Sequence, residues 1–365
     1  MSSLDDKQTL DVVHSTDPQS GRAYADRHHG LRKRAGVSRT WNFATNARRQ
    51  TRSYLQAKQT KGVNAVTVPI MLLWPLRSGL EVAMRVLFDL GDRSSADFLQ
   101  PAGEAALVSP DSVSWRVFKN PISLFIGGVA AVVMELAEPR VRTGIWEHTT
   151  FRNDPIRRLR RTGLAAMVTI YGARSRAEAM IARVGRMHDR VAGLTPTGIA
   201  YRANDPELLN WVQSTAAYSF LQAYHEYVRP LSDVERDRYY AEGTLAASLY
   251  GASAPTSEAA LEMRFEAMAH QLERSDILLE FLAIMRSAPI LPIPLRPLQP
   301  LLIRAAADLT PHWVRRIVGL TDHALNIWEA EVVRQISAVA DRLVLESNPA
   351  VQACRRMRLS TNYLY

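Results

Sequence analysis

The sequence has a single cysteine, Cys354, among its 365 residues. One thiol cannot form an internal disulfide, and thiolate zinc sites and iron–sulfur clusters need several. The nine histidines are scattered, and no His-Glu-x-x-His motif occurs. A glycine-rich phosphate loop and a Gly-x-Ser-x-Gly nucleophile elbow are also missing. These absences argue against thiolate metal centres, helical zinc hydrolases, phosphate-loop nucleotide binding and serine hydrolases of the elbow type.

Long hydrophobic runs are lacking as well. Residues 63–76 are largely apolar, but they are interrupted by two prolines and fall short of the ~20 residues that a membrane-spanning helix needs. Residues 121–137 are apolar and contain Glu135, and we predict that they form a buried helix. The first twenty residues are acidic and polar, so no signal peptide is expected. We therefore predict a cytoplasmic protein, with association at the inner face of a membrane as the alternative.

Positive charge is concentrated near the N-terminus. Residues 21–62 contain eleven Lys and Arg against one acidic residue, Asp26, whereas the whole chain has a formal net charge of +9. This distribution predicts a basic, partly disordered arm over residues 1–62 and a single helical domain over residues 63–365. The arm could contact an anionic membrane surface, but its aromatic residues are too sparse to favour nucleic acid. A solvated arm without a partner is the simpler alternative.

The remaining sequence favours an all-α fold. Apolar residues recur at helical spacing, glycine and proline punctuate the pattern, and no run of alternating strands occurs. Capping side chains followed by proline predict helix starts at Asp154-Pro155 and Asp205-Pro206. Ser232 is predicted to begin another helix, and Thr256 or Ser257 a long one that continues to about Met285.

An arginine-rich run follows the first of these starts. Arg158, Arg161 and Thr162 are spaced i, i+3, i+4, so they converge on one edge of an apolar helical stripe. Arg157 and Arg160 are expected to face water. A solvated basic face is the simpler interpretation, but Thr162 at the apolar border suggests that a neighbouring guanidinium is partly buried. Such a group needs an anionic or polar partner.

His188 lies 26 residues after Thr162. Residues 174–192 are predicted to form one helix, with Ser175 and Glu178 as a capping box. His188 falls on the apolar face, four residues after Val184, and should point towards the interior. A neutral imidazole there could ligate a metal or haem iron. From the residues alone, a core histidine hydrogen-bonded to a backbone carbonyl is the commoner outcome.

A series of short motifs surrounds these two segments in a fixed order. It comprises Ser114-Trp115-Arg116-Val117, Gly127-Gly128, Glu138-Pro139, His148-Thr149-Thr150-Phe151, residues 154–162, residues 188–193, residues 201–206 and Leu209-Asn210-Trp211-Val212. From Trp115 to about Trp211, the chain resembles the family named for the fungal oxygenase of mycophenolic acid biosynthesis and for the catalytic domain of rubber oxygenase, the latex clearing protein.

The resemblance implies a globin-like helical core with additional helices, carrying haem b. The proximal iron ligand of the family falls on His188, its distal arginine on Arg158, and its distal lysine–threonine pair on Arg161 and Thr162. Arg161 departs from the lysine of latex clearing protein, because a guanidinium stays protonated and offers no lone pair to iron. The distal side should therefore hold water, O₂ or substrate, with Arg158 or Arg161 donating hydrogen bonds.

The resemblance also carries the functional prediction. It implies a haem b-dependent oxygenase that uses O₂ for oxidative attack on a carbon–carbon double bond of a small apolar substrate, an isoprenoid or another alkene. The family's catalytic glutamate has no secure counterpart, and Glu135 and Glu147 are both candidates. The alternative is a non-catalytic helical protein that binds a membrane surface or nucleic acid through its basic arm.

Overall fold

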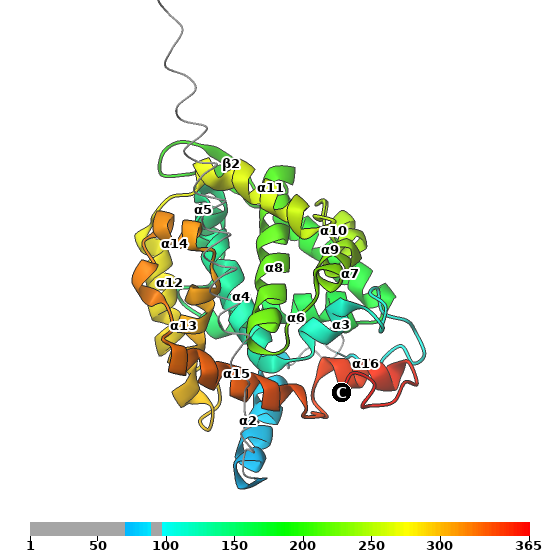
Figure 1. Cartoon of the computed structure of the whole chain (residues 1–365). Coiled ribbons are helices and arrows are strands. Elements are labelled where there is room, and N and C mark those ends of the chain that lie inside the picture. The colour runs from blue at the N-terminus through cyan, green and yellow to red at the C-terminus, as the bar shows by residue number, and fades with distance from the viewer. Residues whose placement is uncertain (1–69, 89–96) are drawn as a thin grey trace, which may run out of the picture. The chain divides into compact units, whose positions relative to one another are not determined.

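The computed structural model describes residues 70–88 and 97–365, so the predicted basic arm lies outside the described residues (Figure 1). The described residues are mostly helical, which confirms the all-α prediction. The elements are α2 (Ile70–Phe88), α3 (Val113–Phe118), α4 (Pro121–Glu135), α5 (Pro139–His148), α6 (Pro155–Tyr171), α7 (Arg174–His188), β1 (Ala192–Leu194), β2 (Ala200–Arg202), α8 (Pro206–Tyr227), α9 (Asp233–Glu242), α10 (Thr244–Leu249), α11 (Glu258–Met268), α12 (Asp276–Ser287), α13 (Gln299–Leu309), α14 (His312–Val318), α15 (Ile327–Asp341) and α16 (Pro349–Arg356), with short 3₁₀ turns at Ala269–Gln271, Arg296–Leu298 and Thr321–His323. The globin-like arrangement stays a prediction.

The centre of the fold is the pair α4 and α8, which run side by side in Figure 1. Helix α4 also packs against α3, α13 and α15, as expected for a helix that is apolar on nearly every side. Gly127 permits the close approach to α8, because a Cβ atom there would lie only 2.9 Å from the Cα atom of Phe220. The prediction of a buried helix over residues 121–137 is confirmed for residues 121–135, and Leu136 and Ala137 follow it as a buried turn.

No single helix among residues 70–88 and 97–365 combines the length and apolarity needed to cross a membrane. The pair α4 and α5, bent by 112°, passes that test by length and composition alone.

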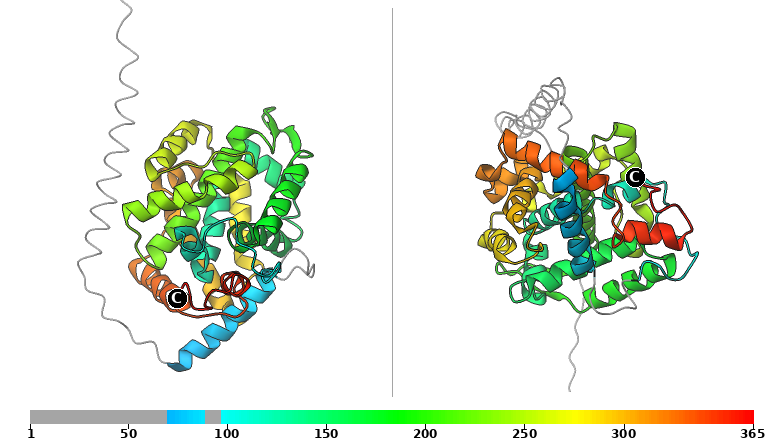
Figure 2. Two further views of the ribbon diagram at one scale, coloured as in Figure 1. Left: turned by 90° about the vertical axis from the view of Figure 1, so that its right-hand side faces the viewer. Right: turned by 90° about the horizontal axis from the view of Figure 1, so that it is seen from below.

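Helix α2 is joined to the C-terminal segment through Glu81. Its carboxylate accepts hydrogen bonds from the backbone N–H groups of Glu346 (2.7 Å) and Ser347 (3.1 Å). Figure 2 (right) shows α2 in blue between the orange α15 region and the red C-terminal helix. Helix α2 is therefore held by hydrogen bonds to the segment between α15 and α16, which begins 265 residues after Glu81 at Glu346.

The predicted helix starts are confirmed where a side chain caps the helix. Asp154 accepts a hydrogen bond from the backbone N–H of Arg157 at the start of α6, and Asp205 caps α8 in the same way. Ser232 and Glu235 form a reciprocal capping box at the start of α9. These local signals therefore fix where the helices around the site begin.

Helix α7 begins at Arg174 as predicted, but its cap and its end differ from the prediction. The helix ends at His188 instead of continuing to residue 192, and the capping box at Ser175 is wrong. The Ser175 backbone N–H and hydroxyl instead donate to the carboxylate of Glu104, at 2.6 and 2.9 Å. Glu178 pairs with Arg174 at 3.0 Å. A tertiary partner has thus taken the groups that a local cap would use.

A short β-hairpin follows α7 that the sequence did not predict. Strands β1 and β2 are antiparallel, with Gly193 opposite Tyr201. Tyr201 is buried on the inner side, and a Cβ atom on Gly193 would lie 2.7 Å from its hydroxyl. Three-residue strands are too short to produce a recognisable alternating pattern.

The long helix predicted from Glu258 to Met285 is broken into α11 and α12. Ser257 caps the first part, as one of the two predicted alternatives, and Ser275 caps the second. Between them the backbone N–H of Glu273 donates to the carbonyl of Ala137 at 3.0 Å. This contact with the segment after α4 needs a non-helical backbone, which helical periodicity alone cannot reveal.

Candidate functional site

Three helices bring Glu135, Arg158 and His188 into electrostatic contact. Glu135 is the last residue of α4, Arg158 lies in the first turns of α6, and His188 is the last residue of α7. Helices α6 and α7 follow each other directly and pack together. The charge of Arg158 acts on both the carboxyl of Glu135 and the imidazole of His188. We refer to these three side chains as the site cluster.

Glu135 lies in a strongly desolvated position. Burial raises the pKa of its carboxyl to about 7, and the nearby Arg158 guanidinium opposes this increase. The residue nevertheless keeps some accessible surface. Glu147, the other candidate glutamate, is exposed and accepts a hydrogen bond from the Tyr201 hydroxyl at 3.4 Å. Of the two, Glu135 is the one that acts on Arg158.

Arg158 is one of two partly buried arginines of the run, with Arg160. Burial lowers the pKa of its guanidinium, whereas the charge of Glu135 raises it. The guanidinium also donates to the hydroxyl of Thr162, and that hydroxyl donates to the backbone carbonyl of Arg158 at 3.1 Å. In its ionised form, Glu135 therefore supplies the anionic neighbour that a desolvated guanidinium requires.

The other predicted side chains on α6 are more exposed. Arg161 and Thr162 are both exposed, and the Arg161 guanidinium reaches across to α7, where it lies 3.8 Å from the sulfur of Met187. Arg157 is exposed, as expected. The expectation for Arg160 is wrong, because its side chain is partly buried and its Nε atom has no hydrogen-bond partner within the described part of the chain.

His188 is half-buried at the C-terminal end of α7. Burial lowers the pKa of its imidazole, and the neighbouring Arg158 charge lowers it further. A hydrogen bond with the side chain of Asn204 acts in the opposite direction. The balance favours a neutral ring, which has one N–H and one nitrogen lone pair.

The side chain of Asn204 presents its amide oxygen to the His188 imidazole. Its amide nitrogen donates to the carbonyl of Gly185 at 3.2 Å and to the carboxylate of Asp189 at 2.6 Å. Since the nitrogen is engaged at the end of α7, the amide oxygen is left to accept the ring N–H of His188. The other ring nitrogen keeps its lone pair. Asn204 was not among the predicted site residues, although it lies within the motif at residues 201–206.

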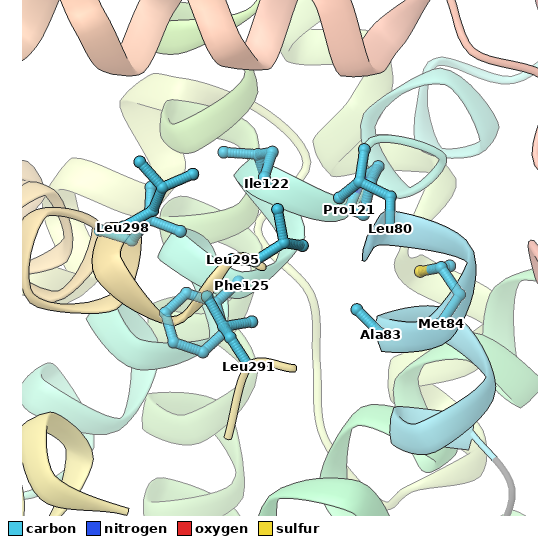
Figure 3. Close-up of a pocket in the computed structure, with 10 residues that line it drawn as sticks. Leu80, Ala83, Met84, Pro121, Ile122, Phe125, Leu291, Leu295 and Leu298 are labelled. Carbon is cyan, nitrogen blue, oxygen red and sulfur yellow. The ribbon is translucent and has the colours of Figure 1, made fainter. Parts of the chain in front are cut away.

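A small apolar cavity lies away from this site, between α2, α4 and residues 291–302 (Figure 3). It has a volume of about 20 Å³, and Leu80, Met84, Phe125, Leu291 and Leu295 are among its lining residues. This is room for about one water molecule, and an apolar lining offers such a water no hydrogen bonds. The cavity is therefore a packing defect of the core and not a substrate site.

Comparison with known families decides the class of protein. Residues 115–342 match the family described as ER-bound oxygenase mpaB/B'/rubber oxygenase, catalytic domain. The chain belongs to this oxygenase family. The matched residues contain the whole site cluster, together with Arg161, Thr162 and Asn204. The family domain extends beyond the main series of motifs, which ends near Trp211, and includes the later segments Leu231-Ser232-Asp233 and Tyr239-Tyr240-Ala241-Glu242, which also fit the family pattern.

Two relatives align with part of this oxygenase-family chain. The uncharacterized protein Rv2237 of Mycobacterium tuberculosis and the uncharacterized protein Mb2261 of Mycobacterium bovis are each 30% identical to it over 116 residues. The alignment covers 30% of this chain and 45% of each relative. No solved structure matches the chain. The family, and not a characterised relative, therefore supplies the functional class.

Proposed function

We propose that this protein is a haem b-dependent oxygenase that acts on a small apolar alkene, such as an isoprenoid. One observation supports the proposal most strongly: the half-buried His188 imidazole at the end of α7 bonds to the side chain of Asn204, and burial and the nearby Arg158 charge lower its pKa, which favours the neutral ring. Family membership supplies the reaction class. The substrate class follows from the resemblance to rubber oxygenase.

The donor groups of the site fit haem. Within residues 70–88 and 97–365, no three His, Cys, Asp or Glu side chains converge to hold a bare metal ion. Haem needs only one protein ligand on the proximal side, because the porphyrin supplies four nitrogens. His188 offers a ring nitrogen lone pair. Its hydrogen bond to Asn204 resembles the outer-shell contact that commonly orients a metal-bound histidine.

Each site residue has a role in this proposal. Haem b, when bound, would supply the iron chemistry that activates O₂ for oxidative attack on a carbon–carbon double bond. His188 would hold the cofactor, and Arg158 and Thr162 would orient O₂ through hydrogen bonds. Arg161 cannot act as a ligand and would remain a hydrogen-bond donor.

Glu135 is our choice for the family's catalytic glutamate. A carboxyl with a pKa of about 7 can either hold or accept a proton at neutral pH, which suits general acid–base catalysis. Its position beside Arg158 keeps this proton close to the groups that would orient O₂. The exposed Glu147 has no comparable relation to Arg158.

The visible absorption spectrum tests the proposal. Protein expressed with a haem precursor should show an intense Soret band, and His188→Ala should lose or shift it. The matched control is His225→Ala, because the Nδ1 atom of His225 accepts the backbone N–H of Leu231 and is already engaged. A correctly folded wild-type protein without a Soret band would contradict haem binding.

The alternative function, membrane or nucleic-acid binding by a non-catalytic protein through the basic arm, is less well supported. Membership of an oxygenase family favours catalysis. The arm at residues 1–62 lies outside the described residues, and the predicted cytoplasmic location also stays a prediction. Removing the arm should abolish binding if this alternative holds, and should leave oxygenase chemistry intact if the proposed function holds.

A further inference from the structure

The β1–β2 hairpin exposes large aliphatic side chains to solvent. Leu194 is 63% exposed and Ile199 is 52% exposed, on either side of the turn. The ladder pairs Leu194 with Ala200 and Ala192 with Arg202, and all four are exposed, whereas the intervening Tyr201 is buried. The hairpin therefore has an inner face that packs against α5 and an outer face without a partner in the described chain.

Three arginines surround the base of this hairpin. Arg186 and Arg190 lie near the end of α7, and Arg202 lies on β2 opposite Ala192, two residues after Arg190. All three are exposed, and none forms an ion pair with another residue of the described segments. The contrast is with arginines that do form ion pairs: Arg116, Arg140, Arg142, Arg152, Arg174, Arg229, Arg236, Arg238, Arg304, Arg315, Arg334 and Arg355.

One carboxylate lies next to this group in the sequence. Asp189 precedes Arg190 and accepts the amide N–H of Asn204 at 2.6 Å, a bond that leaves its negative charge in place. The three guanidinium groups outnumber this single carboxylate. The exposed surface of the hairpin thus combines an apolar tip, formed by Leu194 and Ile199 on either side of the turn, with cations at its base, formed by Arg190, Arg202 and, in the last turn of α7, Arg186. We call this combination the hairpin face.

We propose that the hairpin face binds an anionic phospholipid membrane. The tip lies two residues along the strand from the base, which corresponds to about 7 Å. This separation fits a membrane interface, where apolar groups enter by roughly 5–10 Å and cations remain among the headgroup phosphates. Guanidinium groups also bind phosphate through paired hydrogen bonds. The order of apolar tip and cationic base therefore matches the order of layers in a membrane.

The hairpin face is joined directly to the site. The backbone N–H of Val191 donates to the carbonyl of His188 at 3.0 Å, and Asn204, just after β2, contacts the end of α7. Membrane docking would place His188 close to the surface from which a lipid-dissolved alkene enters. This consequence rests on the proposed function, whereas membrane binding itself does not require haem or turnover.

A fluorophore at the tip tests the inference in the full chain. Cys354 is buried, so an environment-sensitive thiol label should react with Ile199→Cys and leave the native cysteine unlabelled. The matched control is Met263→Cys on α11, where the side chain is 64% exposed. With phosphatidylcholine vesicles that contain phosphatidylserine, the label at residue 199 should brighten and shift to the blue, and the label at residue 263 should not.

The arginines are tested with the same label. Arg190→Gln with Arg202→Gln should weaken the vesicle response about 25-fold, since each basic residue near an anionic membrane contributes about fivefold. The control pair is Arg274→Gln with Arg342→Gln, two exposed arginines elsewhere, and should leave the response unchanged.

Three results would overturn the inference. A silent label at residue 199 on vesicles that retain the protein would assign binding to another segment, such as residues 21–62. An equal response to vesicles of phosphatidylcholine alone would remove the role of the arginines. A response that depends on protein concentration without vesicles would show instead that the hairpin face binds a second copy of the chain.

Discussion

Burial keeps the Glu135 carboxyl protonated over a pH range in which an exposed glutamate is ionised. The folded state therefore binds a proton that the unfolded state releases between the ordinary pKa of 4.5 and the raised value of about 7. Stability should fall as pH rises through this range, by up to about 3 kcal/mol from this residue. Glu135→Gln should remove that part of the pH dependence, as measured by urea unfolding at pH 5 and pH 8.

The control for this experiment is Glu147→Gln. Glu147 is exposed, so its replacement should preserve the wild-type difference in unfolding free energy between the two pH values. If Glu135→Gln retains the full wild-type difference, the desolvated carboxyl is not responsible for it.

Asn204 should determine the protonation pattern of the His188 ring. In Asn204→Leu the ring N–H loses its acceptor, so the imidazole should populate both neutral tautomers and its pKa should fall further. Nitrogen-15 NMR of the imidazole in the haem-free protein measures both effects. Asp189→Ala is the control for the tautomer, because it removes one amide contact of Asn204 and leaves the acceptor oxygen in place. Loss of the Asp189 charge should lower the imidazole pKa in this variant too, but without mixing the tautomers. A single unchanged tautomer in Asn204→Leu would exclude this positioning role.

At the scale of helices, Gly127 and Gly128 offer a matched pair of substitutions. A Cβ atom at Gly127 would meet the α8 backbone at 2.9–3.0 Å, whereas one at Gly128 finds its nearest neighbour at 3.9 Å. Gly127→Ala should therefore destabilise the protein by about 1–3 kcal/mol through overpacking. Gly128→Ala should be neutral or stabilising by up to about 1 kcal/mol, because it removes glycine from a helix interior. Chemical denaturation of both variants measures the difference, and equal effects would contradict the close approach of α4 and α8.

Helix starts could be predicted from the sequence where the capping side chain belongs to the same segment. Asp154 and Asp205 cap their helices with their own side chains and are followed by proline, so sequence alone located α6 and α8. Ser175 carries a similar signal, but its hydroxyl bonds to Glu104, 71 residues away in sequence. Such long-range competition cannot be detected in a local pattern, and this is also why the break between α11 and α12 was missed.

In the site, too, contacts within one helix could be predicted from the sequence, and contacts between distant segments could not. Arg158 and Thr162 lie one helical turn apart, so their hydrogen bond follows from spacing. Glu135 lies on a different helix, and only the tertiary fold, in which its charge and that of Arg158 act on each other, distinguishes it from Glu147 as the neighbour of Arg158. Asn204 approaches His188 because a hairpin returns the chain to the end of α7, and that hairpin was not predicted.

At the scale of the whole molecule, the excess of positive charge and the site cluster lie in different parts of the chain. Residues 21–62 carry eleven basic residues and one acidic residue, while the formal charge of the entire chain is only +9. The site cluster and the family domain lie in residues 115–342. Long-range attraction to polyanions should therefore depend mainly on the N-terminal segment, and cofactor binding on the helical segment.

Two variants should separate these properties. A chain lacking residues 1–62 should keep the Soret band and elute from heparin at much lower salt, because most of the net positive charge is gone. Full-length His188→Ala should show the reverse behaviour, with unchanged heparin elution and no normal Soret band. Absorption spectra and salt-gradient elution of both proteins measure this. Loss of the Soret band on truncation would show that the N-terminal segment contributes to the cofactor site, and that cofactor binding and charge are not separable along the chain.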